Sequence, residues 1–278
     1  MKEAVIRYIP IDDHFRMRTD ALQQQIQLDQ QTGLSPFMVI ASAGTTDTGA
    51  MDPLDDIGSI CQRLNIWYHV DAAYGGFFIL AKAVKEKFKG IEKADSITID
   101  PHKGLFLPYG SGAVLVKDTR ALYEAHYYKA NYLQDTDRMK GEIPPADLSP
   151  ELTKHFRGLR MWLPLKLFGV ETFRAALDEK VWLCRYFYEA VQAIGFEVGP
   201  YPDLSIMMFR YVPARGDANA FNAAIVNRLL EDGRVFLSTT TIDDIYWIRL
   251  AVVCFRSHLE HVELTLKILQ DIVKELEG

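Results

Sequence analysis

Short apolar runs of strand length alternate with helical patterns along the first half of the chain, and no other feature of the sequence restricts the fold as much. The strand-like runs are AVIRYIPI, FMVIASAG, IWYHVDAA, DSITID and GSGAVLVKD. The helical segments expected between them are RTDALQQQIQLDQQTG, DPLDDIGSICQRLN and FFILAKAVKEKFKGIEKA. A continuous apolar run such as FMVIASAG is typical of a strand that is covered on both faces. The alternation therefore predicts an α/β fold, with a mainly parallel sheet and helices on both of its faces.

The second half of the chain departs from this alternation. The pattern from about Arg157 to Ile194 predicts a helix that is interrupted near Pro164 and Gly169. Strand-like runs follow at FEVGP, SIMMFRYV and YWIRLAVV, with amphipathic helices at DANAFNAAIVNRLLEDG and RSHLEHVELTLKILQDIVKELE. Strands and helices in this mixed order predict a second, smaller α+β domain at the C-terminal end.

The composition argues against several classes of protein. The formal net charge is -6 and there is no basic run, so nucleic acid is not expected as a partner. No apolar segment is long enough to cross a bilayer, and the first residues turn acidic where a signal peptide needs an apolar core. The cysteines Cys61, Cys184 and Cys254 are far apart, with no CxxC pair. We therefore predict no metal site, reduced thiols and a cytoplasmic location.

Three of the predicted strands end beside residues that suit catalysis. Asp71 ends one strand, Thr45 and Thr46 follow a second, and His102 and Lys103 follow a third. The carboxyl ends of parallel strands share one edge of a sheet, and ligands bind beyond that edge. We therefore expect these side chains to lie close together. Small residues after Asp71 are expected to leave room there for a flat ligand against the backbone, namely Ala72, Ala73, Gly75 and Gly76.

Lys103 stands between Asp-Pro-His and the apolar stretch Gly-Leu-Phe-Leu. Burying an unpaired ammonium is costly, so the lysine either points into solvent or has its nitrogen covalently engaged as a Schiff base. A lysine forms such an imine with the aldehyde of pyridoxal phosphate. An aspartate that faces the pyridine nitrogen keeps this nitrogen protonated, and the ring can then absorb electrons. Ala73 could lie beneath such a ring, and Thr46 and His102 could hold its polar edge or its phosphate.

Each of these residues also has an ordinary structural explanation. Asp71 fits a turn or a helix N-cap, and His102 fits a hydrogen-bonded structural histidine. Thr46 could cap the helix that opens near Pro53. The combination is more specific than any of its members, because three separate strand ends supply the groups.

Several segments together resemble one enzyme family. HVDAAYGG, followed about 30 residues later by DPHKGL, resembles the group II pyridoxal-phosphate-dependent amino-acid decarboxylases, such as the aromatic-L-amino-acid, histidine and glutamate decarboxylases. GTTDTGAMDPLDDI and FRGLRMW also look like segments of that family, in the family's order. The resemblance implies a fold-type-I architecture, pyridoxal 5'-phosphate as cofactor, and a homodimer with sites at the subunit interface.

The resemblance also implies residue roles. Lys103 would carry the internal aldimine, Asp71 would pair with the pyridinium nitrogen, and Ala73 would contact the ring. Thr46 and His102 would line the cofactor site, with His102 also counted among the catalytic residues. Tyr132, in YYKANYLQDTD, would donate a proton to the substrate carbon from a loop that closes over the neighbouring subunit's site.

The same comparison suggests an organisation for the chain. We predict that residues 1–120 belong to the cofactor-binding large domain, 121–156 form a catalytic loop and connector, and 157–278 form the small domain. Members of the family are considerably longer at the N-terminus, so the chain resembles the C-terminal portion of such an enzyme. The remainder would stack on the cofactor ring and bind its phosphate, so a complex with a chain that supplies this N-terminal half is the alternative to a homodimer. We expect the chain alone to be inactive.

Two alternatives stay open from the sequence. The first keeps pyridoxal phosphate but changes the reaction to aldehyde-forming oxidative deamination, aminotransfer or desulfuration. The second is a truncated, non-catalytic chain that acts as a dimerisation or binding module. If the chain is a decarboxylase, its substrate is an L-amino acid whose side chain the sequence does not specify.

Overall fold

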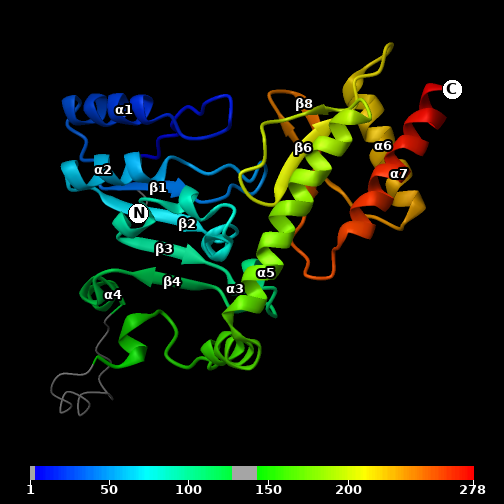
Figure 1. Ribbon diagram of the computed structural model, residues 1–278. Helices are drawn as coiled ribbons and strands as arrows, with labels where there is room; N and C mark the ends of the chain where they lie inside the picture. Colours follow the sequence, from blue (N-terminus) through cyan, green and yellow to red (C-terminus); the bar gives the residue numbers. More distant parts are fainter. Residues whose placement is uncertain (1–3, 127–142) are drawn as a thin grey trace.

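The computed structural model describes residues 4–126 and 143–278. A four-stranded sheet occupies the N-terminal half, in the order β1-β2-β3-β4 (Figure 1). Its strands are β1 (Met38–Ser42), β2 (Trp67–Ala72), β3 (Ser96–Ile99) and β4 (Ala113–Val116). The first three are parallel, and β4 runs antiparallel to β3. The predicted, mainly parallel sheet is confirmed.

Helices α1 (Thr19–Gln31) and α2 (Leu54–Leu64) form where the apolar spacing predicts them. α2 has two aspartates in its first turn, which suit the positive end of a helix dipole. It ends at Asn65, which adopts the left-handed conformation that closes many helices. The buried side of α2 joins the strands in one apolar core.

The expected helix in FFILAKAVKEKFKGIEKA is not a single helix. The structure has three short 3₁₀ helices there, η1 (Gly76–Leu80), η2 (Lys85–Phe88) and η3 (Ile91–Lys93). Gly90 separates the last two with a φ of 93°, a conformation that would break a continuous α-helix.

The strand predicted at AVIRYIPI is wrong. Residues 4–10 form no strand, and the nearest pairing is an isolated bridge between Ile11 and Met17. The segment is attached through a side chain instead, because Arg7 donates three hydrogen bonds to Asp29 of α1, the shortest of 2.8 Å. A β-branched, apolar run can form a strand only where a neighbouring strand offers partners to its backbone.

The two faces of the N-terminal sheet differ. Along β1 and β2, alternate side chains are buried on one face, as Val39 and Val70 are. On the opposite face, Met38 is 42% and Ile40 is 55% exposed. The core of the described residues therefore lies on one face of this sheet.

The C-terminal half contains a second sheet, antiparallel throughout, in the order β5-β6-β8-β7. Its strands are β5 (Glu197–Val198), β6 (Ile206–Arg210), β7 (Ser238–Ile242) and β8 (Ile245–Ala251). Helices α5 (Gly158–Ala193), α6 (Ala218–Asp232) and α7 (Leu259–Glu277) pack with it around a second apolar core. The α+β character predicted for this half is confirmed.

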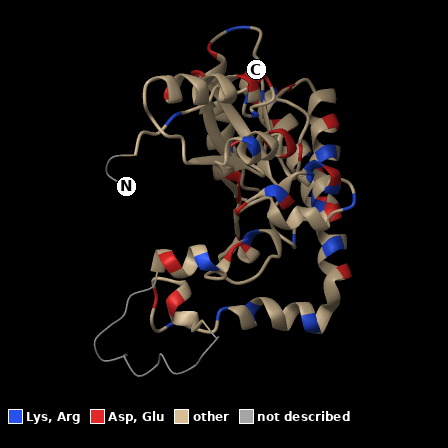
Figure 2. Cartoon of the chain, turned by 90° about the vertical axis from the view of Figure 1, so that its left-hand side faces the viewer, with Lys and Arg blue, Asp and Glu red and all other residues tan. Residues whose placement is uncertain are grey.

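Helix α5 is bent at Gly169, where φ is 72° and ψ is 161°. Figure 2 shows the two parts of this helix at a large angle, one crossing the bottom of the view and the other rising at the right. The predicted interruption near Gly169 is therefore confirmed, whereas Pro164 lies within the helix.

The remaining described elements are short. They are α3 (Pro101–Gly104), α4 (Thr119–His126) and η5 (Pro145–Leu148). Within residues 4–126 and 143–278, no helix combines the length and the apolar character needed to cross a membrane.

Polar contacts between the segments that flank the two sheets join the two halves. The hydroxyl of Tyr74, just after β2, lies 2.8 Å from Oγ of Ser205, just before β6. Lys87 forms an ion pair of 2.6 Å with Asp203. The loop after β1 is thereby fixed beside the second sheet, since Asp203 also accepts a hydrogen bond from the backbone of Met51.

Candidate active site

The carboxyl ends of β1, β2 and β3 lie along one edge of the N-terminal sheet. Ser42 of β1 is the register partner of Asp71, and Asp71 is the register partner of Thr98 on β3. The parallel pairing confirms that the strand ends identified in the sequence share this edge. Asp71 therefore lies in a row between two hydroxyl-bearing residues.

Asp71 is exposed at this edge, and the backbone just after its strand holds its carboxylate. Its Oδ1 accepts a hydrogen bond of 3.1 Å from the backbone of Ala73. This is the turn contact that its ordinary structural explanation predicts, and it also fixes the orientation of the carboxylate. Ala73 itself lies half-buried immediately after the strand.

Two glycines after Asp71 serve close packing. A Cβ added at Gly75 would lie 2.0 Å from the carbonyl oxygen of Ala43, and one at Gly76 would lie 2.8 Å from the side chain of Ile99. The expectation that these glycines leave room for a ligand is corrected, because neighbouring protein atoms already fill that space.

Lys103 lies on α3, directly after β3. Pro101 takes the first helical position, which suits its fixed φ, and Asp100 is the N-cap residue. The ammonium of Lys103 lies 2.8 Å from Oδ2 of Asp100, and 45% of the lysine side chain is exposed. The lysine is therefore neither buried without a partner nor wholly free in solvent.

His102 is more enclosed than Lys103. Its side chain is 13% exposed, and its Nε2 lies 3.7 Å from the same oxygen of Asp100. Its Nδ1 is buried and has no hydrogen-bond partner among the described residues. Buried polar atoms are nearly always partnered, so an unsatisfied nitrogen beside Lys103 suits a group that a ligand completes.

Two residues around His102 were not predicted from the sequence. The ring of Tyr109 lies against the imidazole, with 5.1 Å between the ring centres. Arg160, on the first part of α5, donates a hydrogen bond of 2.8 Å to the carbonyl of Tyr109. The FRGLRMW segment, which contains Arg160, was the one feature of the sequence that pointed to this residue. Its contact with Tyr109 could not be predicted, because the two residues are 51 positions apart in the sequence.

Thr46 is held through its backbone. Its carbonyl accepts a hydrogen bond from Arg249 on β8, and Nε of the same arginine donates to the carbonyl of Asp47 over 2.6 Å. Within the same loop, the hydroxyls of Thr45 and Thr48 lie 2.7 Å apart. Arg249 thus fixes the loop that carries Thr46, and Thr46 itself is exposed. Tyr132 lies outside the described residues.

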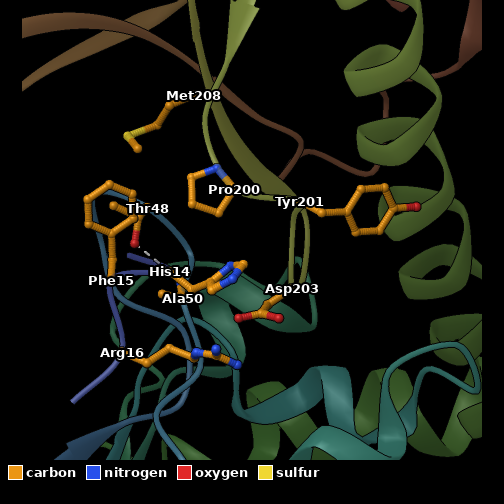
Figure 3. Close-up of a pocket in the computed structure, with 9 residues that line it drawn as sticks. All are labelled: His14, Phe15, Arg16, Thr48, Ala50, Pro200, Tyr201, Asp203 and Met208. Atoms are coloured by element: carbon orange, nitrogen blue, oxygen red, sulfur yellow. Dashed lines mark hydrogen bonds between the residues drawn. The ribbon is translucent and has the colours of Figure 1, made fainter. Parts of the chain in front are cut away.

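A small cavity lies between the N-terminal segment, the loop after β1 and the second sheet (Figure 3). Its volume is about 30 Å³. It is lined by His14, Phe15, Arg16, Thr48, Ala50, Pro200, Tyr201, Asp203 and Met208. Space of this size admits a water molecule but no cofactor. The cavity is a packing gap where the halves meet.

The donor set at the sheet edge fits pyridoxal phosphate. Lys103 offers an amine to an aldehyde, Asp71 offers a carboxylate to a ring nitrogen, and His102 offers an unsatisfied nitrogen. Groups that would surround a phosphate are not evident among these residues. The site edge is open and accessible in the described part of the chain.

Comparison with known proteins gives a consistent result. Residues 1–212 match the family described as pyridoxal-dependent decarboxylase conserved domain. The chain is 35% identical over 260 residues to an aromatic-L-amino-acid decarboxylase of Bacillus atrophaeus, covering 91% of this chain and 54% of that protein. It is 34% identical to a histidine decarboxylase of Rattus norvegicus, covering 89% of this chain and 37% of that protein.

Solved structures support the same relationship. The structure of Oryza sativa TDC with pyridoxal phosphate and tryptamine matches with a TM-score of 0.91 and 26% identity, covering 98% of this chain and 58% of that one. Catharanthus roseus tryptophan decarboxylase in complex with L-tryptophan matches with a TM-score of 0.86 and 27% identity, covering 97% and 56%. The fold is thus of fold-type I. The chain spans about half the length of these structures, and it belongs to the pyridoxal-dependent decarboxylase family.

Proposed function

We propose that this chain takes part in the pyridoxal-phosphate-dependent decarboxylation of an L-amino acid, which yields the amine and carbon dioxide. The observation that carries the proposal is the placement of Lys103 and Asp71 at the carboxyl ends of the adjacent parallel strands β3 and β2. The similarity to decarboxylases that act on aromatic amino acids and on histidine supports the reaction type.

Different residues of this chain would bind different parts of the cofactor. Pyridoxal phosphate, when bound, withdraws electrons from the α-carbon of the substrate. Lys103 would supply the amine that takes up its aldehyde, and release from Asp100 would bring the lysine nitrogen to it. Asp71 would hold a proton on the ring nitrogen, because a carboxylate beside a cation favours the charged form. His102, Ala73 and Thr46 would line the ring and its polar edge.

The orientation of Asp71 supports its assigned role. Its Oδ1 is already occupied by the backbone of Ala73, so the carboxylate is held in place before any ligand arrives. A group that is positioned in advance loses little entropy when it binds, and this favours a defined contact with the ring nitrogen.

Self-association forms part of the proposal. The first part of α5 exposes large apolar side chains, which are Leu159, Trp162, Leu163, Leu167 and Phe168. A run of apolar surface on one helix suits burial against another chain. We propose a homodimer and the division into residues 1–120, 121–156 and 157–278. The proton-donor role of Tyr132 stays a prediction from the resemblance.

Reduction of the cofactor linkage tests the proposal. The protein is mixed with pyridoxal phosphate, treated with borohydride and digested, and the modified peptide is identified by mass. We expect the adduct on Lys103 and its loss in Lys103→Ala, whereas Lys82→Ala, which removes an exposed lysine, retains it. An adduct that persists in Lys103→Ala at the wild-type level would overturn the assignment. Release of carbon dioxide from labelled L-amino acids then tests the reaction.

A further inference from the structure

A chain of hydrogen bonds crosses the less covered face of the N-terminal sheet toward Asp71. The indole Nε1 of Trp67 lies 2.8 Å from Oγ of Ser96, and Nδ1 of His69 lies 2.7 Å from the same oxygen. Nε2 of His69 lies 3.3 Å from Oγ1 of Thr98. These four residues link β2 to β3, and we call them the His69 ladder.

We propose that His69 is a positioning residue for Asp71: the His69 ladder holds the imidazole neutral with its proton on Nε2, and leaves the hydroxyl proton of Thr98 for the Asp71 carboxylate. The proposal rests on the proposed function, in which Asp71 faces the ring nitrogen of the cofactor.

The register of the sheet puts these residues on one face. His69 and Asp71 are two positions apart on β2, so their side chains point the same way, about 6–7 Å apart along the strand. Ser96 is the register partner of His69, and Thr98 is the register partner of Asp71. Thr98 is thus the residue that connects the row of His69 with the row of Asp71.

The hydrogen-bonding capacities of the groups set the direction of the ladder. An indole nitrogen can only donate, so Ser96 accepts from Trp67. Ser96 is 7% exposed, and its own hydroxyl proton therefore needs an acceptor, which Nδ1 of His69 provides. His69 then carries its proton on Nε2 and donates it to Thr98. The opposite tautomer would leave the Ser96 proton without a described acceptor.

The charge of His69 follows from its surroundings. Burial lowers the pKa of His69, and the nearby negative charge of Asp71 only partly opposes this effect. The imidazole is therefore neutral at neutral pH. A neutral imidazole leaves the negative charge of Asp71 available to the ring nitrogen, whereas an imidazolium on the same face would compete for it.

Two donors would then fix the carboxylate of Asp71. The backbone of Ala73 donates to Oδ1, as the structure shows, and Thr98 holds a hydroxyl proton in the same row. Loss of His69 would free Thr98 to turn away, and the carboxylate would lose one of the groups that orient it. We expect this loss to lower the protonation of the ring nitrogen and to have little effect on the linkage between Lys103 and the cofactor.

Three substitutions separate loss of the His69 ladder from a general disturbance of the sheet. His69→Leu removes both hydrogen bonds of the imidazole. His69→Gln keeps an acceptor toward Ser96 and a donor toward Thr98, and is therefore expected to restore the ladder. Ile40→Val is the control, because Ile40 is the register partner of His69 on β1 and its side chain makes no hydrogen bonds.

The tautomer is measured first, without cofactor. Proton–nitrogen NMR correlations of the protein labelled at histidine nitrogen should show His69 protonated on Nε2, and Ser96→Ala should weaken this preference. A proton on Nδ1 in the wild-type protein would overturn the inference. This readout does not depend on the proposed function.

The ring nitrogen is measured next, with nitrogen-labelled pyridoxal phosphate. In His69→Leu we expect a normal adduct on Lys103 and a ring-nitrogen signal shifted toward the unprotonated form. His69→Gln should recover most of the wild-type ring-nitrogen signal. A normal adduct with an unchanged ring-nitrogen signal in His69→Leu would overturn the inference. Absence of any Lys103 adduct in the wild-type protein would instead overturn the proposed function.

Discussion

The ammonium of Lys103 and the carboxylate of Asp100 form an ion pair of 2.8 Å across one turn of α3. The same carboxylate oxygen lies 3.7 Å from Nε2 of His102. Asp100 therefore faces both residues that are assigned to the cofactor at the end of β3, His102 and Lys103. Asp100 is also the N-cap residue of α3. One residue therefore both starts this helix and contacts the side chains of His102 and Lys103.

Replacing Asp100 should affect cofactor capture more than stability. The Lys103 side chain is 45% exposed, and ion pairs of such groups contribute at most about 1 kcal/mol to folding. In Asp100→Ala we expect nearly unchanged unfolding in urea but a several-fold change in the rate at which Lys103 is trapped by pyridoxal phosphate and borohydride. Asp118→Ala, which removes an exposed carboxylate paired with Arg120, is the control. Equal trapping rates in both variants would show that Asp100 has no role in positioning the lysine.

The contact between Tyr74 and Ser205 should contribute to stability. The Tyr74 hydroxyl accepts a hydrogen bond of 3.1 Å from the Ser205 backbone and lies 2.8 Å from Oγ of Ser205, and both residues are buried. Burial raises the pKa of Tyr74, so the phenol stays neutral. Tyr74→Phe leaves a buried N–H without a partner, which costs about 1–3 kcal/mol. Ser205→Ala keeps that N–H bonded and should cost less. A larger loss in Ser205→Ala than in Tyr74→Phe, measured by urea unfolding, would contradict this account.

Sequence patterns predicted the elements whose partners are local or repeated. β1, β2 and β3 have apolar runs that find parallel neighbours, and α6 and α7 have clear helical spacing. β7 was missed because STTTI is polar and its pairing depends on the following strand. The turn between β7 and β8 has positive φ at Asp243 and Asp244, as tight hairpins require, but the sequence lacks the usual glycine there.

The candidate site was predicted in outline from the same patterns. Asp71, His102 and Lys103 follow strands whose direction is fixed by alternation with helices, so their common edge could be inferred. Asp100, Tyr109 and Arg249 could not be inferred in this way. Their roles depend on contacts between side chains and distant backbone, such as the one from Arg249 to the carbonyl of Thr46, and no periodic pattern records such contacts.

The ion pair of Asp29 should make the attachment of the N-terminal segment depend on pH. The hydrogen bonds from Arg7 hold the pKa of Asp29 below its ordinary value of 3.8. A carboxyl group with a lower pKa in the folded state stabilises that state above its unfolded pKa. This contribution is lost as the pH falls through the folded pKa. Arg7→Ala should therefore lower the Tm at pH 7, and the difference from wild type should shrink as the pH falls below the ordinary aspartate pKa of 3.8.

The control for this effect is a pair that does not join the segment to α1. Arg234→Ala removes the partner of Asp232 at the end of α6, while residues 4–10 stay attached. Hydrogen exchange of residues 4–10 should increase in Arg7→Ala and stay at the wild-type level in Arg234→Ala. Equal exchange in both variants would mean that the Arg7–Asp29 pair does not hold the segment.

Gly90 should be among the least replaceable residues of the N-terminal half. Its φ is 93°, and an added Cβ would lie 2.3 Å from Cα and 2.4 Å from the backbone nitrogen of Asp55, at the start of α2. Gly33 has a similar φ of 83°, but an added Cβ there would meet no atom of the described residues within 4 Å. The two positions therefore share the conformational strain and differ in the close approach of the backbone.

Comparing Gly90→Ala with Gly33→Ala separates these two causes. Strain alone predicts about 1 kcal/mol at both positions, because alanine adopts positive φ poorly. The clash at Gly90 involves backbone that cannot rotate away, so η3 and the first turn of α2 must move apart, and the total should be about 3 kcal/mol or more. Urea unfolding of the two variants measures the difference. If Gly90→Ala costs no more than Gly33→Ala, the contact between this loop and α2 is loose enough to yield, and the close packing of this helix end would not contribute to holding the sheet edge in place.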